Sequence, residues 1–291
     1  MTLVYRDYDQ AALDRQYNNQ ANVSEPRRYL DWYAIASEKA RARVQCIADV
    51  AYGALPDERL DIFTPEGCAA GDRRPAVAFI HGGAWRHLGL KQSSFAAETF
   101  TARGALYVAL GFSRMPAAGS LDEMVAQVRN SLAWLYDNIA AHGGDPSRLY
   151  LAGHSSGAHL AAMALGTDWP RLYGLPEQIL RGAVLVSGIY DLEPVRLCYR
   201  NELLKLDRAA ELRNSPCRNL PVSGPPALVV HAELDTDEFC RQARDFAALW
   251  QRRYGNAELL SLEGLNHYDA AESLTDAASP LARRTLAWCG L

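Results

Sequence analysis

One segment of the chain joins an apolar, strand-like run to a helix-like run through Gly153-His154-Ser155-Ser156-Gly157. A Gly-x-Ser-x-Gly sequence in this context predicts a sharp turn that holds the middle serine clear of its own backbone. The glycines two residues to either side leave room where strand and helix converge. Ser155 is therefore a candidate nucleophile. The alternative role for a serine at this position is to cap the helix.

Apolar strand-like runs and helix-like runs alternate along most of the 291 residues. This alternation predicts an α/β fold with a mainly parallel sheet and helices on both faces. Strands are expected at 44–50, 59–63, 76–80, 105–110, 149–152, 182–186, 227–230 and 258–262, the first two as an antiparallel pair. Helices are expected at 121–141, 237–254 and 281–289, with a turn at 143–146.

Two further segments do not fit this alternation. Residues 8–43 are polar and helix-like and predict an N-terminal helical arm. Residues 190–220 are charged, helix-like and too long for a simple crossover, which predicts a small helical cap over a site. Since no linker or internal repeat interrupts the chain, we expect one domain over residues 1–291.

Composition excludes several classes of function. The net charge is −4 with no basic block, which argues against nucleic acid or an anionic membrane as a partner. The six cysteines are scattered without a CxxC pair, the start lacks an apolar signal core, and no segment reaches transmembrane length. These features predict a cytoplasmic protein with a small-molecule substrate. No metal-binding, phosphate-binding or dinucleotide-binding motif is present, so we expect no metal and no organic cofactor, and a homodimer is possible.

A glycine pair follows the strand-like run at 76–80, in His81-Gly82-Gly83-Ala84. In a parallel sheet, ligands bind at the carboxyl ends of the strands. Backbone N–H groups that converge there can stabilise the oxyanion of an acyl-transfer reaction. We predict an oxyanion hole formed by the N–H groups of Gly83, Ala84 and Ser156; a plain glycine turn is the alternative.

An acid and a base are also expected at strand ends. Asp235 follows the strand at 227–230, where it could orient an imidazole. Glu233 and Asp237 are rival acids, and residues 235–238 also read as a helix capping box. His267 follows the last strand and is the predicted base. The order Ser…Asp…His along the chain is the one that α/β-hydrolases use.

Aromatic residues are candidates for substrate binding. Trp85 follows the glycine pair, and Tyr190 and Tyr199 lie in the predicted cap. We predict that Trp85 and Tyr190 bind substrate, and Tyr199 is a third candidate. For each of them the alternative is packing in the core.

The chain resembles the α/β-hydrolase type of kynurenine formamidase (arylformamidase), within the wider group of esterases with a His-Gly-Gly loop. The likeness covers nearly the whole chain and rests on segments 13–19, 81–86, 153–160, 187–195, 214–216, 233–239 and 265–268. It implies the α/β-hydrolase fold and a catalytic triad of Ser155, Asp235 and His267. The family usually carries an aromatic residue where this chain has Ala84, and often a tyrosine near residues 111–113, where this chain has none.

The resemblance implies a serine hydrolase that cleaves N-formyl arylamines, similar to N-formylkynurenine in tryptophan catabolism, to amine and formate. A carboxylesterase acting on small aryl or alkyl esters is the nearest alternative, because it needs the same triad. A non-catalytic small-molecule receptor on a hydrolase scaffold is a third reading. It is disfavoured because all three triad positions are occupied.

Overall fold

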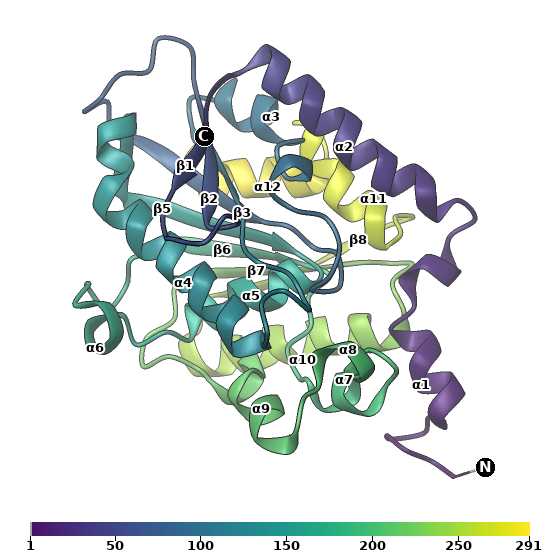
Figure 1. The fold of residues 1–291 in the computed structure, drawn as a ribbon. Coiled ribbons are helices and arrows are strands. Elements are labelled where there is room, and N and C mark those ends of the chain that lie inside the picture. The colour runs from purple at the N-terminus through teal and green to yellow at the C-terminus, as the bar shows by residue number, and fades with distance from the viewer. Residues whose placement is uncertain (1) are drawn as a thin grey trace.

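The computed structural model describes residues 2–291 and is built around one eight-stranded sheet (Figure 1). The strand order is β1-β2-β4-β3-β5-β6-β7-β8; β2 is antiparallel to both of its neighbours, and all other pairs are parallel. The strands are β1 (Gln45–Ala51), β2 (Arg59–Thr64), β3 (Arg74–Ile80), β4 (Leu106–Leu110), β5 (Gly144–His154), β6 (Gly182–Val186), β7 (Ala227–Ala232) and β8 (Ala257–Leu262). The predicted α/β fold with a mainly parallel sheet is confirmed.

Helices cover both faces of the sheet (Figure 1). The α-helices are α1 (Gln10–Gln16), α2 (Pro26–Arg43), α3 (Ala97–Thr101), α4 (Leu121–Asn138), α5 (Ser156–Leu165), α6 (Trp169–Tyr173), α7 (Glu193–Leu197), α8 (Asn201–Leu204), α9 (Arg208–Arg213), α10 (Asp237–Tyr254), α11 (His267–Glu272) and α12 (Pro280–Trp288). Short 3-10 helices are η1 (Asn19–Asn22), η2 (Leu90–Gln92), η3 (Ile139–His142), η4 (Pro216–Arg218) and η5 (Ser273–Thr275).

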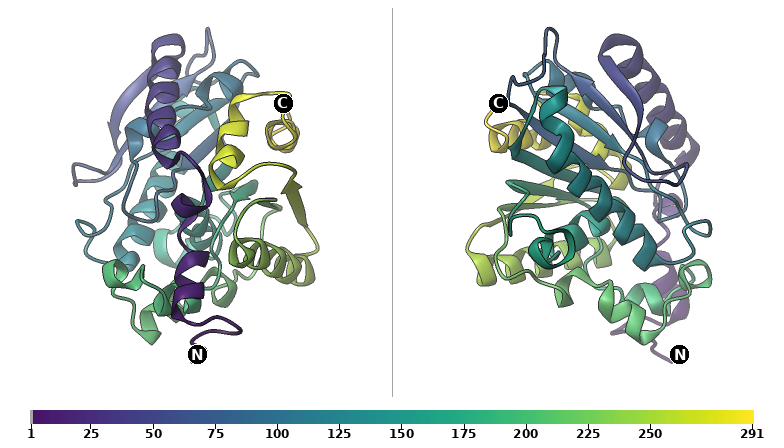
Figure 2. Two further views of the ribbon diagram at one scale, coloured as in Figure 1. Left: turned by 90° about the vertical axis from the view of Figure 1, so that its right-hand side faces the viewer. Right: turned by 60° about the vertical axis from the view of Figure 1, so that its left-hand side comes forward.

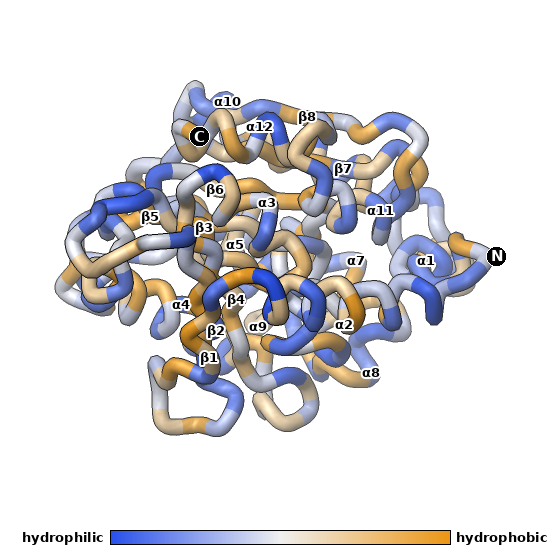
Figure 3. Tube along the Cα trace, turned by 90° about the horizontal axis from the view of Figure 1, so that it is seen from above, coloured by the Kyte–Doolittle hydropathy of each residue, from blue (hydrophilic) through white to orange (hydrophobic). Residues whose placement is uncertain are grey.

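The core lies in two layers, one on each side of the sheet. Alternate residues of β3 show the division, since Ala78 and Ile80 pack into one layer while Val77 and Phe79 pack into the other. Helices α4, α5 and α10 cover the first layer, and α2, α3, α11 and α12 cover the second. In Figure 3 the strands in the middle are mainly orange, whereas much of the blue lies on the outer loops and helix turns. Burial on both faces explains the continuous apolar runs of the central strands.

Most predicted boundaries lie within two residues of the observed ones, and the larger differences are at the end of α4 and the start of β5. The helix expected over 121–141 ends at Asn138, where the chain tightens into η3 before Gly143 adopts a left-handed φ of 87°. The expected turn at 143–146 overlaps the start of β5, because Gly144 already pairs with Arg74 of β3. Sequence alone could not place this start, since the pairing shifts register immediately afterwards.

The N-terminal residues form helices α1, η1 and α2, which run along the molecule beside the sheet (Figure 2, left). Helix α2 packs against α3 and η2, whereas α1 contacts α7 and α10. Residues 190–220 form the short helices α7, α8, α9 and η4. Both segments approach the edge where the parallel strands end, and both contribute side chains to the cavity described below.

Candidate active site

The turn between β5 and α5 has the geometry that the Gly-x-Ser-x-Gly sequence predicts. Ser155 adopts φ 56° and ψ −122°, a conformation that L-residues rarely take. A Cβ on Gly153 would lie 2.6 Å from the carbonyl oxygen of Gly157, and one on Gly157 would lie 2.2 Å from that of Ile80. Strand and helix therefore approach too closely for any side chain at these two positions.

Ser155, Asp235 and His267 come together at the carboxyl edge of the sheet. The Nε2 atom of His267 lies 2.9 Å from Ser155 Oγ, and its Nδ1 atom lies 2.6 Å from Asp235 Oδ1. The three residues are 7%, 9% and 5% exposed in sequence order. Each follows a strand, Ser155 after β5, Asp235 after β7 and His267 after β8. This arrangement allows proton transfer from a serine hydroxyl to an oriented imidazole.

The second oxygen of Asp235 is held by two donors. Ser187 Oγ donates to Oδ2 at 2.6 Å, and the backbone N–H of Ala232 donates at 3.0 Å. Burial alone would raise the pKa of Asp235, but the attraction of His267 and the hydrogen bonds from His267, Ser187 and Ala232 outweigh it. The pKa therefore lies below its usual value, and the carboxylate is charged at neutral pH.

Neither rival acid approaches His267. Glu233 accepts a hydrogen bond from the backbone N–H of Gly264 on the surface, and Asp237 is the first residue of α10. The N-cap of α10 is Thr236, which forms no side-chain capping bond. The alternative role of Asp235 in a capping box is therefore not what the structure shows.

The loop after β3 presents unused backbone donors. Among residues 2–291, the N–H groups of Gly83, Ala84 and Ser156 donate no hydrogen bond to another protein group. The next N–H, that of Trp85, donates to Ser156 Oγ at 3.1 Å and ties the loop to the elbow. Gly83, Ala84 and Trp85 all have positive φ, with values of 103°, 55° and 59°. This conformation leaves three N–H groups available for an anionic oxygen.

His154 connects the elbow to the segment that carries His267. Its Nε2 atom lies 2.8 Å from the backbone carbonyl oxygen of His267, and because a carbonyl only accepts, Nε2 carries the proton. Burial, and to a lesser degree neighbouring His267, lower the pKa of His154 to about 3, so the ring is neutral. The sequence analysis assigned no role to His154 or to Ser187. The strand-end rule that found the triad would have found Ser187, which directly follows β6.

A cavity of about 390 Å³ opens in front of Ser155 and His267. Its walls combine the loop after β3, the N-terminal arm and the cap. They are formed by Asn18, Asn19, Gln20, Leu30, Tyr33, Gly83, Ala84, Arg86, His87, Leu88, His154, Ser155, Tyr199, Arg200, Glu202, Leu203, Leu204, His267 and Tyr268.

The two aromatic residues predicted to bind substrate are not in these walls. Trp85 turns into the core, where its Nε1 donates to Nδ1 of His159 at 3.2 Å. Tyr190 stacks on Phe246 with 4.2 Å between ring centroids and is also buried. The residue type alone did not predict that both side chains point into the core and away from the cavity. The third candidate, Tyr199, does line the cavity, together with Tyr33 and Tyr268.

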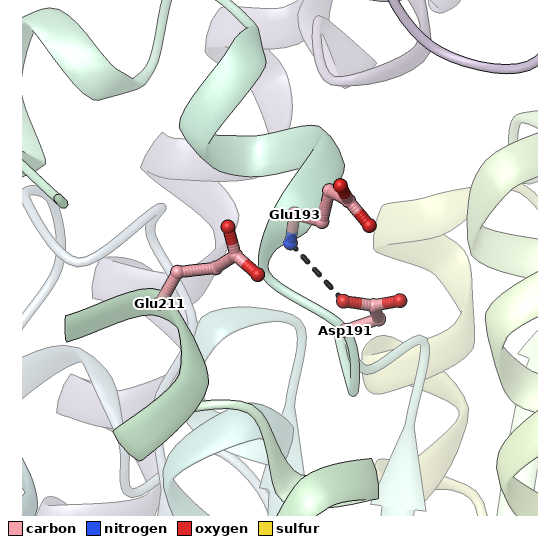
Figure 4. Close-up of side chains that lie close together, drawn as sticks. All are labelled: Asp191, Glu193 and Glu211. Atoms are coloured by element: carbon pink, nitrogen blue, oxygen red, sulfur yellow. Dashed lines mark hydrogen bonds between the residues drawn. The ribbon is translucent and has the colours of Figure 1, made fainter. Parts of the chain in front are cut away.

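One group of acidic side chains in residues 2–291 has spacing suited to a metal ion. Asp191, Glu193 and Glu211 offer oxygen atoms within 4.8 Å of one another (Figure 4). Asp191 accepts a hydrogen bond from the Glu193 backbone N–H, and Glu211 is paired with Arg196 at 2.5 Å and Arg208 at 2.6 Å. The two arginines offset two of the three negative charges of the cluster, so the acids are held mainly by protein partners.

In the described chain, residues 2–291, no helix combines the length and the hydropathy needed to cross a bilayer.

Two family models match the chain. The BD-FAE model matches residues 60–170, and the prolyl oligopeptidase family model matches residues 118–289. Both matches include the segment around Ser155.

The chain is similar to several proteins whose names describe hydrolases. The kynurenine formamidase of Danio rerio is 37% identical over 82% of this chain and 80% of its own length. The isoprenylcysteine alpha-carbonyl methylesterase ICME of Arabidopsis thaliana is 30% identical over 76% of this chain and 56% of its own length. A structure from Silicibacter sp. TM1040, described as a thioesterase, superposes with a TM-score of 0.81 at 25% identity, covering 93% of this chain and 97% of that one.

Proposed function

The chain belongs to the kynurenine formamidase family of α/β-hydrolases, and from this membership we propose that it hydrolyses N-formyl arylamines to the free amine and formate. The observation that carries the proposal is the hydrogen-bonded series from Asp235 through His267 to Ser155. N-formylkynurenine is a representative substrate, since the relative from Danio rerio is a kynurenine formamidase.

In the proposed reaction, Ser155 Oγ attacks the formyl carbon while His267 Nε2 accepts the hydroxyl proton. Asp235, charged and buried, holds the Nδ1–H of the imidazolium that forms. The carbonyl oxygen becomes an oxyanion, and the N–H groups of Gly83, Ala84 and Ser156 are proposed to stabilise it. Removing one such donor in other enzymes costs about 10²–10³ in kcat.

His267 then returns its proton to the nitrogen of the substrate, because an amine anion is too poor a leaving group to depart. The C–N bond breaks, the arylamine leaves, and a formyl ester remains on Ser155. Water attacks this ester while His267 accepts its proton, and the proton then passes to Ser155 Oγ as formate leaves. A formyl group has no side chain, so specific binding has to come from the amine, which occupies the cavity between arm and cap.

The proposal is tested by comparing kcat/KM for N-formyl arylamines with kcat/KM for phenyl acetates of the same ring substitution. A formamidase shows turnover of the formamide that disappears in Ser155→Ala. A strong preference for the acetate would instead support a carboxylesterase, the alternative that the methylesterase relative favours. Labelling of Ser155 by a fluorophosphonate excludes a non-catalytic receptor, which should stay unlabelled.

We also propose that the chain forms a single domain over residues 1–291, with 8–43 as an arm and 190–220 as a cap. Participation of all eight strands in one sheet supports it. The proposed cytoplasmic location is supported by the six cysteines, which are all free thiols. Homodimerisation stays a prediction, and light scattering on the purified protein measures it directly.

A further inference from the structure

Among residues 2–291, the cavity wall contains an amide side chain that forms no hydrogen bond to another protein group. Asn19, the first residue of η1, is 6% exposed and lines the cavity. Within residues 2–291 its side chain forms no hydrogen bond, and its amide atoms are not among the fully enclosed polar atoms that lack a partner, so they are open to the cavity. A primary amide offers two donors and an acceptor. An amide that has no protein partner and is open to a substrate cavity is therefore available to hydrogen-bond a ligand group.

The backbone around Asn19 is fixed on both sides. On one side, the carbonyl oxygen of Tyr17 accepts from Arg200 Nε at 2.9 Å and from the Tyr199 hydroxyl at 3.2 Å. The buried Tyr17 hydroxyl accepts from Gln242 of α10 at 3.0 Å.

On the other side, the hydroxyl of Tyr29 accepts from Asn266 Nδ2 at 2.8 Å, and its ring stacks on Tyr268 at 4.7 Å. The segment between Tyr17 and Tyr29 therefore joins the cap to the helix that begins at His267 (Figure 2, left). Asn19 is held in place before a ligand arrives, so the amide can select a ligand without first being ordered.

We propose that Asn19 is a specificity-determining residue that hydrogen-bonds a polar substituent on the leaving amine or alcohol of the substrate. The inference rests on the proposed function, since the reacting carbonyl must lie between Ser155 and the loop at Gly83. The leaving group then extends into the rest of the cavity, whose walls include the apolar side chains Leu30 and Leu203. A ring packs against such walls, whereas a substituent that reaches Asn19 gains hydrogen bonds that an unsubstituted ring cannot form.

The test uses two matched series of substrates: formanilide and its ring carboxamides, and phenyl acetate and its ring carboxamides. A carboxamide is the probe because it can pair with both halves of the Asn19 amide. The wild-type enzyme should show at least about tenfold higher kcat/KM for the best carboxamide isomer than for the unsubstituted compound, which corresponds to one new hydrogen bond.

Asn19→Leu should remove this preference, so that kcat/KM for the best carboxamide isomer falls about tenfold relative to kcat/KM for the unsubstituted compound. Asn22→Leu is the matched control, because Asn22 is exposed, lies in the same helix η1 and does not line the cavity. Asn22→Leu should change neither the preference for the carboxamide nor kcat/KM for the unsubstituted substrate. Asn19→Asp keeps the shape of the side chain and removes its N–H donors, so the preference should also fall if Asn19→Leu does not fold.

Equal losses on both substrates in the Asn19 variants, or no loss on either, would overturn the inference. Turnover of acetates alone with the preference intact would overturn formamidase activity and leave the role of Asn19 standing. Turnover of formamides without the preference would support formamidase activity and overturn the role of Asn19. If neither series reacts, binding is compared through protection of Ser155 from fluorophosphonate labelling. The inference then requires that aminobenzamide protects better than aniline and that Asn19→Leu abolishes this difference. Equal protection by the two compounds would overturn the inference.

Discussion

The imidazole of His154 donates a hydrogen bond from Nε2 to the backbone carbonyl oxygen of His267, with 2.8 Å between the two atoms. The residue that precedes the nucleophile is thereby bonded to the main chain of the predicted base, 113 positions later. The two rings lie 4.9 Å apart, and His154 is buried and neutral. We infer that His154 is a positioning residue, which holds the backbone from which the His267 side chain reaches Ser155.

Replacement of His154 should therefore slow the chemical step without weakening substrate binding. His154→Leu leaves the carbonyl of His267 without its donor, and we expect kcat to fall about tenfold at nearly constant KM. His154→Gln can place an N–H donor at a similar reach and should recover most of that loss. Steady-state kinetics on one N-formyl arylamine measures both variants. Equal defects in the two variants would show that the volume of the ring matters and its hydrogen bond does not.

Loss of the Asp235 charge should be far more damaging. Asn in place of Asp235 keeps the volume but presents an amide to Nδ1 of His267, which favours the wrong tautomer of the base. A decrease in kcat of about 10³–10⁴, with KM little changed, is expected. Glu233→Gln is the control, since Glu233 lies on the surface away from His267. A Glu233→Gln defect as large as that of Asp235→Asn would reassign the acid.

Three buried neutral histidines should make the fold sensitive to acid. Burial lowers the pKa to about 4 for His81, about 3 for His154 and about 4 for His159. Since each is about 6.5 in the unfolded chain, the unfolded state binds more protons below that pH. The stability that these groups contribute is complete above pH 6.5 and falls as the pH drops toward 4. Each group adds a slope of about 1.4 kcal/mol per pH unit.

His159→Gln tests this directly, because glutamine can also accept from Trp85 and donate to the carbonyl of Asn214. The free energy of unfolding, measured with urea between pH 7 and pH 4.5, should depend less steeply on pH in the variant than in the wild type. Parallel curves for the two proteins would contradict the prediction, whatever their absolute stabilities.

The loop that carries the proposed oxyanion donors should not tolerate a side chain at Gly83. Its φ is 103°, and a Cβ there would lie 2.1 Å from the carbonyl oxygen of His87. Gly83→Ala must therefore displace the loop, and we expect kcat to fall about 10²–10³-fold. Gly67→Ala also introduces a Cβ at positive φ, 68°, but into open space, and should leave kcat unchanged. Unchanged kcat in Gly83→Ala would exclude this loop from oxyanion stabilisation.

The sheet and the proximity of Ser155, Asp235 and His267 could both be predicted from the sequence, because both depend on where the buried parallel strands lie and end. Buried parallel strands appear as continuous apolar runs, and their carboxyl ends share one edge of the sheet. The same rule applied after β6 points to Ser187, the donor to Asp235 that sequence reasoning overlooked.

The cavity walls were less predictable, because they depend on contacts between distant parts of the chain. Trp85 follows the glycine pair, but its N–H bond to Ser156 and its positive φ turn the indole into the core. Asn19 belongs to the polar N-terminal arm, and nothing in the sequence of that arm distinguished its buried residues from its exposed ones. Two residues earlier, the carbonyl oxygen of Tyr17 accepts a hydrogen bond from Arg200, 183 positions away. No local pattern encodes such pairings.

The central claim, that Ser155 carries the acyl group, is tested most directly by intact-mass measurement of enzyme quenched with acid during turnover of an N-formyl arylamine. The account predicts a mass increase of one formyl group, located on the peptide that contains Ser155. It also predicts that Ser155→Ala shows no adduct and loses at least about 10³-fold in kcat. An adduct on another residue, or wild-type turnover by Ser155→Ala, would contradict the account.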